Sequence, residues 1–219
     1  TEITLINTKI NGCVANENGG GLYIKDSRLT LTNATIGGEQ LYSGTQAGKT
    51  KGNKAKNGGG IYAQGTLTMK HCTVSHNTAT TSGVLSADGG GIYAIGNKLT
   101  MTLCTVKSNM AKTGGGIKKD NDEFTMTNCT LTNNVATDNG GGIFTMGTCD
   151  FTMANCTLSG NTVNLDDAQI GQTGRVGNVN IGAVNELDAK SHVTANATKA
   201  NTLSASGANI QSDASVQML

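Results

Sequence analysis

The chain of 219 residues contains no proline or tryptophan, and only 3% of its residues are aromatic, which excludes a globular core of packed rings. Charged residues make up 14% of the chain, against roughly 25% in ordinary globular domains, and the net charge is +1. The sequence has no block of like charges that would bind nucleic acid, and no apolar run long enough for a membrane-spanning helix.

A repeated phrase organises the chain from near its beginning. Three glycines, an aliphatic residue and then usually an aromatic residue occur five times, with the first glycines spaced 39, 31, 25 and 26 residues apart. The copies begin at Gly19, Gly58, Gly89, Gly114 and Gly140. A shortest period near 25 residues with variable excess is typical of a solenoid with loops of different lengths. We expect each triplet to form a corner, because the next coil of a β-solenoid lies only about 4.8 Å away.

A second phrase alternates with the glycine triplets. Its clearest copy is residues 67–74, and the others span 3–10, 29–36, 99–106, 124–131 and 151–158. Apolar residues alternate within it, which indicates strand rather than helix, and the break between Met69 and Cys72 predicts a corner. With a third strand after each triplet, the pattern predicts an all-β, parallel β-helix of about six or seven coils with irregular loops.

The longest insertion, residues 37–52, precedes the second triplet. Loops of free length that project from a rigid solenoid often carry recognition. We therefore predict that Tyr42, Lys49 and Lys51 belong to a binding loop.

The position after the triplets is the most aromatic in the chain. It carries Tyr23, Tyr62, Tyr93, Lys118 and Phe144. Alternation places these side chains outward, so we expect an exposed strip that could stack against sugar rings or a partner protein. The alternative is that the rings only stabilise the sheet by stacking on one another.

Four of the six cysteines share one repeat position. They are Cys72, Cys104, Cys129 and Cys156, with spacings of 32, 25 and 27 residues that match no zinc pattern. Parallel stacked side chains suit a disulfide poorly, so we expect a buried ladder of thiols that pack as small apolar groups. Cys13 aligns with the asparagine position described next, and Cys149 is expected in the loop before Phe151. No metal and no cofactor is expected.

Two polar ladders accompany the cysteines. Stacked asparagines are expected to exchange amide hydrogen bonds along the axis, at Asn53, Asn77, Asn109, Asn134 and Asn161. Threonines repeat at the second position of the strand phrase and again after the cysteine, and flat threonine arrays can bind ice. Against ice binding, solvent-facing strands are often rich in threonine because of its high β-strand propensity, and Lys70 and His71 interrupt the flat array.

Catalytic groups do not converge in the sequence. The acidic residues are few and mostly in loops, whereas a glycosidase needs two nearby carboxylates. His71 and Cys72 face apart by alternation, so they form no nucleophile and base pair. We expect a non-enzymatic protein, with a polysaccharide-binding or polysaccharide-cleaving β-helix and an ice-binding protein as the alternatives.

The phrase Val74-Ser75-His76-Asn77 recurs at 106–109, 131–134 and 158–161. Together with the glycine triplets it resembles the repeats of polymorphic outer membrane proteins, which are autotransporter-type surface proteins. This chain has Val or Leu where that family usually has Phe, and a third glycine where it usually has Ala. The resemblance covers residues 3–161 and implies a right-handed β-helix passenger, displayed extracellularly or at the outer membrane and often adhesive.

The resemblance also implies the partners. They would be a protein or glycan on a host or neighbouring cell, with self-association along the helix axis as a further expectation. No nucleic acid and no membrane insertion by this segment is expected. The chain opens inside a repeat, so we expect a mature or trimmed piece of a longer protein.

Both phrases disappear after Asn161. We therefore divide the chain into β-helix repeats at 1–161 and a second part at 162–219. This second part is expected to form degenerate coils, a cap or a tail that a partner orders.

Overall fold

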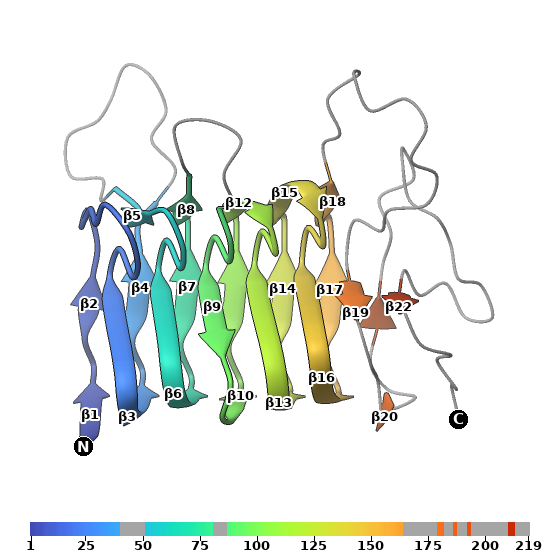
Figure 1. Ribbon diagram of the computed structural model, residues 1–219, viewed down its shortest axis with the longest axis horizontal. Coiled ribbons are helices and arrows are strands. Elements are labelled where there is room, and N and C mark those ends of the chain that lie inside the picture. The colour runs from blue at the N-terminus through green and yellow to red at the C-terminus, as the bar shows by residue number, and fades with distance from the viewer. Residues whose placement is uncertain are drawn as a thin grey trace.

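The computed structural model describes residues 1–39, 51–80 and 87–163, together with four short strands, β19 to β22. The predicted loop residues Tyr42 and Lys49 lie outside the described residues. Within the described part, all regular secondary structure is β-strand and all strand pairing is parallel. The strands stack in chain order along one axis, which is the parallel β-helix that the repeats predict (Figure 1).

Three sheets form the sides of the helix. The long sheet contains β1 (Glu2–Ile6), β3 (Leu22–Thr32), β6 (Ile61–Lys70), β9 (Ile92–Ile95), β10 (Leu99–Thr102), β13 (Ile117–Thr127), β16 (Ile143–Ala154), β19 (Val179–Ile181), β20 (Glu186–Leu187) and β22 (Ile210–Ser212). The second sheet contains β2 (Lys9–Ile10), β4 (Thr35–Gly37), β7 (Thr73–Ser75), β11 (Thr105–Lys107), β14 (Thr130–Thr132), β17 (Thr157–Ser159) and β21 (His192–Val193). The third sheet contains β5 (Lys54–Ala55), β8 (Thr78–Ala79), β12 (Met110–Thr113), β15 (Val135–Asn139) and β18 (Thr162–Val163).

Equivalent residues of successive coils pair directly. Leu67 pairs with Leu99 and Leu99 with Phe124, and all three are buried in one continuous core. The predicted corner between Met69 and Cys72 is confirmed, because His71 has a φ of 53° and separates β6 from β7. The chain thus turns through a left-handed residue where the alternation breaks.

The glycine triplets are corners, as expected, and the three glycines serve different purposes. In the second triplet only Gly58 has a positive φ, of 59°. A Cβ on Gly59 would lie 2.6 Å from the Gly90 carbonyl oxygen, and one on Gly60 would lie 2.5 Å from that of Gly91. The first glycine therefore turns the chain, and the other two allow the next coil to approach.

The asparagine ladder is confirmed. Asn109 Nδ2 donates to Asn134 Oδ1 at 3.0 Å and to the Val74 carbonyl at 3.0 Å, while Asn109 Oδ1 accepts from the Asn77 backbone N–H at 2.9 Å. The same contacts continue from Asn53 to Asn161. Cys13 takes the asparagine position at the N-terminal end, since its N–H donates to Asn53 Oδ1.

The cysteine predictions are confirmed for the ladder and wrong for Cys149. Cys72, Cys104, Cys129 and Cys156 are all at most 1% exposed. Cys149 does not lie in a loop: it is a buried core residue of β16 and pairs with Asp122 of β13. One extra residue in β16 opposite Asp120–Asp122 shifts the register and turns the side chain inward.

Candidate binding site

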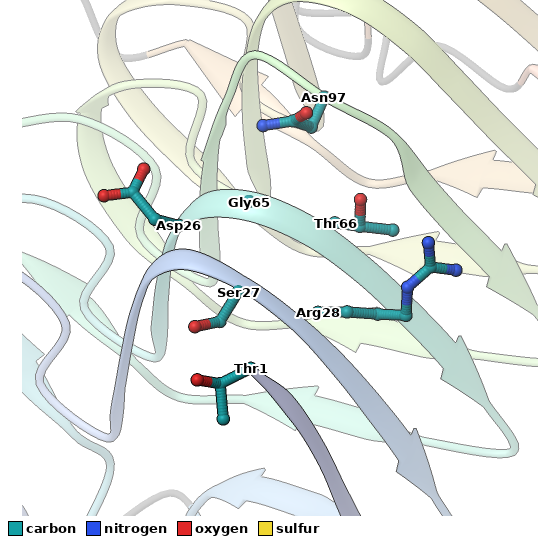
Figure 2. A pocket seen from close by; sticks show the side chains of 7 residues that line it. All are labelled: Thr1, Asp26, Ser27, Arg28, Gly65, Thr66 and Asn97. Atoms are coloured by element: carbon teal, nitrogen blue, oxygen red, sulfur yellow. The ribbon is translucent and has the colours of Figure 1, made fainter.

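A polar depression lies on the outer face of the long sheet near its N-terminal coils (Figure 2). It encloses about 400 Å³ and is lined by Thr1, Asp26, Ser27, Arg28, Gly65, Thr66 and Asn97. β3 has one more residue than β6 between Lys25 and Arg28, so Asp26 adopts a φ of 49° and the strand bulges. Gly65 lies beneath this bulge, and any Cβ there would collide with the Ser27 carbonyl oxygen.

The lining offers hydrogen-bond donors and acceptors on different sides. Figure 2 shows the Asp26 carboxylate and the Arg28 guanidinium pointing in opposite directions. The hydroxyls of Thr1 and Ser27 point to the same side as Asp26. Asp26 is the only carboxylate among the seven lining residues.

Sequence reasoning missed this depression. Its signal is an irregularity between the two repeated phrases, where Gly65 in one coil aligns with Asp26-Ser27 in the coil before. A bulge of this kind interrupts the alternation without changing the phrases on either side. It becomes a hollow only when the coils are stacked.

Tyr23 is the exposed end of an aromatic stack, and its predicted exposure is confirmed at 51%. Its ring is stacked on that of Tyr62, with centroids 5.5 Å apart and an interplanar angle of 5°. β1 pairs only with Arg28–Thr32 of β3, so β1 does not cover Tyr23. Tyr23 and Arg28 both point outward, because Ile24 and Leu29 beside them are buried.

The rest of the expected strip is not exposed. Tyr62 is 6% and Tyr93 is 8% exposed, so the prediction of an exposed strip is wrong at these two residues. Each ring is covered by its neighbours: Tyr62 lies between Tyr23 and Tyr93, and Lys118 Nζ lies 4.7 Å above the centroid of the Tyr93 ring. Burial, followed by the charge of Tyr23, raises the pKa of Tyr62. Phe144 is half-buried, with Lys118 Nζ 6.0 Å from its ring centroid.

An ionic cluster is built around Lys118. Its Nζ lies 2.8 Å from Asp88 Oδ2 and 3.9 Å from Asp120 Oδ2. The Tyr93 hydroxyl donates to Asp120 Oδ2 at 2.6 Å. All four side chains are buried, and burial together with the Asp120 hydrogen bond raises the pKa of Tyr93 well above its usual value. Lys118 therefore links the corner before Gly89 to β13.

Lys119 is wholly inside the helix, where sequence reasoning did not place a charge. It pairs with Ala94 on one side and Thr145 on the other, and its Nζ donates to the backbone carbonyls of Asp120 and Asn121. Burial lowers the pKa of Lys119 and raises that of the nearby Cys149 thiol to about 11. The sequence did contain a sign that this position faces inward, because the equivalent residues of the two preceding coils are the small, buried Ala63 and Ala94.

The remaining predicted site residue, Lys51, is exposed, and its carbonyl accepts from the Gly12 N–H at 2.8 Å. In the described part of the chain, no group of three or more His, Cys, Asp or Glu side chains is placed to hold a metal ion. No helix there has the length and apolar character to cross a membrane.

Comparison with known proteins identifies one family. Residues 2–218 match the family described as "right handed beta helix region". This match establishes the handedness that the resemblance implied, and it does not distinguish the polymorphic outer membrane protein type from other β-helices. No curated protein and no solved structure matches the chain.

Proposed function

Because the chain belongs to the right-handed β-helix family, we propose that it acts as a rigid, non-enzymatic binding domain, secreted or displayed on a cell surface as an adhesin or passenger. Its ligand is a glycan of a host or neighbouring cell. The observation that carries this proposal is the exposed Tyr23 ring on the same outer strand face as the polar depression.

The Tyr23 ring and the polar depression together offer the groups that a sugar ligand needs. The Tyr23 ring offers an apolar face for the C–H groups of a pyranose, and stacking on Tyr62 holds it in place. Arg28, Asp26 and Ser27 offer charged and hydroxyl groups for the sugar hydroxyls. Tyr23 and Arg28 are five positions apart at about 3.3 Å per residue, so an extended oligosaccharide would reach both.

Binding is favoured over cleavage by the distribution of carboxylates. Hydrolysis of a glycosidic bond generally requires two carboxyl groups flanking it, and the depression has Asp26 alone. Asp88 and Asp120, which lie together elsewhere on the long sheet, are buried against Lys118. A passenger of the polymorphic outer membrane protein type would have this combination of a stiff scaffold and an external ligand site.

The proposal is tested by screening the folded chain on a glycan array and measuring the affinity of the best ligands by calorimetry. Tyr23→Ala is expected to weaken binding at least tenfold, and Tyr23→Trp to retain it. Lys107→Ala, an exposed change on the second sheet, is the matched control and should leave affinity unchanged. An array without a reproducible ligand, or equal affinity for Tyr23→Ala and the parent chain, would refute glycan binding at this site.

A further inference from the structure

The thiols of the cysteine ladder form a column parallel to the helix axis. Each cysteine directly precedes a strand of the second sheet, in which β7, β11, β14 and β17 are consecutive neighbours; β7, β14 and β17 are labelled in Figure 1. The first residues of the strands pair in register, at Thr73, Thr105, Thr130 and Thr157. Backbone hydrogen bonds of 2.8–2.9 Å join the Cys72, Cys104 and Cys129 carbonyls to the next coil. Consecutive cysteines are therefore one strand spacing apart, about 4.8 Å.

The four side chains also have the same orientation. Each Sγ donates to the carbonyl two residues before it, at 3.2 Å for Cys72 and 3.3 Å for Cys104, Cys129 and Cys156. The same contact in four coils gives the side chains one orientation, and Cys72 Sγ also contacts the Leu31 carbonyl at 3.4 Å. From the shared orientation we infer that the sulfur atoms follow the strand spacing. Every cysteine of the chain is a thiol, and a disulfide would need its sulfurs at about 2.05 Å.

We propose that consecutive thiols of this column bind a soft, two-coordinate metal ion, Hg(II), between the sulfurs of neighbouring coils. Half of the coil spacing is about 2.4 Å, close to the roughly 2.3 Å bond that thiolate sulfur makes with zinc. The two sulfur–metal bonds would lie along the helix axis, roughly perpendicular to the direction in which the cysteine side chains point. The column thus has the spacing for linear coordination and lacks the convergence that tetrahedral zinc requires.

The charge balance favours a divalent ion. Each Hg(II) forms two metal–sulfur bonds, replaces the protons of two thiols and releases two protons, which leaves a neutral complex. Neutrality matters because these side chains are at most 1% exposed, and a net charge there would be costly. The column takes two ions, one between Cys72 and Cys104 and one between Cys129 and Cys156.

The test uses the full chain with Cys13→Ala and Cys149→Ala, so that only the column thiols remain. Alanine is a suitable replacement in the column itself, since Ala34 already occupies the preceding coil. After equilibration with mercuric chloride, native mass spectrometry is expected to show two ions per chain, with two protons released per ion. The far-ultraviolet circular dichroism of the β-helix should be retained, and zinc should not bind.

Two variants in this background contain the same number of thiols and differ only in whether they are neighbours. Cys72→Ala with Cys104→Ala keeps the adjacent Cys129 and Cys156, and is expected to bind one ion with release of two protons. Cys104→Ala with Cys156→Ala keeps Cys72 and Cys129, two coils apart, and is expected to form no bis-thiolate complex. Equal stoichiometry in the two variants, binding accompanied by loss of the β signal, or no binding at equilibrium would overturn the proposal.

Discussion

The hydroxyl of Tyr93 donates a 2.6 Å hydrogen bond to Asp120 of the next coil, and both side chains are buried although they point away from the core. The outer face of the long sheet therefore contains a second buried layer, made of rings and paired charges. The contacts within this layer and within the asparagine ladder lead to four predictions about stability.

Replacing Tyr93 by Phe is expected to lower the free energy of unfolding by about 1–3 kcal/mol at pH 7, because the Asp120 carboxylate loses its donor in a buried site. The change should also alter the response to alkali. The raised pKa of Tyr93 means that the unfolded chain loses this proton first above about pH 10, so stability falls by up to about 1.4 kcal/mol per pH unit. Urea denaturation across that range should give a shallower decline for Tyr93→Phe; parallel curves would contradict this account.

Replacing Lys118 by Met is expected to cost about 3–5 kcal/mol, because Asp88 and Asp120 then share a buried site without their cation. Adding Asp88→Asn and Asp120→Asn to this variant should recover part of the loss. Lys98 is the matched control, since its ion pair with Glu123 is half exposed and Lys98→Met should cost less than about 1 kcal/mol. Similar denaturation midpoints for the two lysine variants would show that the Lys118 cluster is not stabilising.

Replacing Asn109 by Ala is expected to cost roughly 2–5 kcal/mol, because a buried donor loses its acceptor and further side-chain hydrogen bonds are lost with it. The change leaves the Asn77 N–H buried without its acceptor and breaks the amide bonds of Asn109 to Asn77 and Asn134. Asn57→Ala provides the comparison, because Asn57 is half-buried, its amide donates to Asn18 and its oxygen accepts a longer bond, of 3.3 Å, from the Asp88 N–H; about 1 kcal/mol is expected. Thermal and urea denaturation of both variants would measure the difference, and an equal cost would argue against the ladder as a main source of stability.

Alanine variants of Tyr23 and Tyr62 should differ in stability, and only Tyr23 is proposed to contact the ligand. Tyr62→Ala removes a ring that is packed on both sides, so a loss of about 3–5 kcal/mol is expected. Tyr23→Ala removes a half-exposed ring at the end of the stack and should cost clearly less. Denaturation of the two variants checks this order, and the reverse order would mean that Tyr23 is a structural residue.

Much of the fold could be predicted from the sequence because each coil repeats the same local rules. The glycine triplet, the alternating apolar residues and the break before Cys72 specify a corner, a strand and a second corner wherever they occur. Repetition then specifies which residues stack, and this is why the asparagine and cysteine ladders were predictable. The resemblance added handedness, which a pattern of alternation does not contain.

The candidate site was less predictable, because it depends on what lies in adjoining coils. Alternation correctly placed Tyr62 and Tyr93 outside the core, yet neighbouring rings and Lys118 bury them. Tyr23 has the same pattern and remains exposed because β1 begins beyond it. The depression at Asp26 and Gly65 likewise needs two coils with different numbers of residues.

The sequence by itself thus determined the architecture, the register and the identity of the stacked residues, since these follow from local periodicity. Only the tertiary structure decided which outward residues are covered, that Lys119 and Cys149 face inward, and that the four thiols share one orientation. The physical reason is that burial and side-chain direction depend on contacts between coils, and the residues in contact lie 24 or more positions apart in pairs such as Asn53 and Asn77.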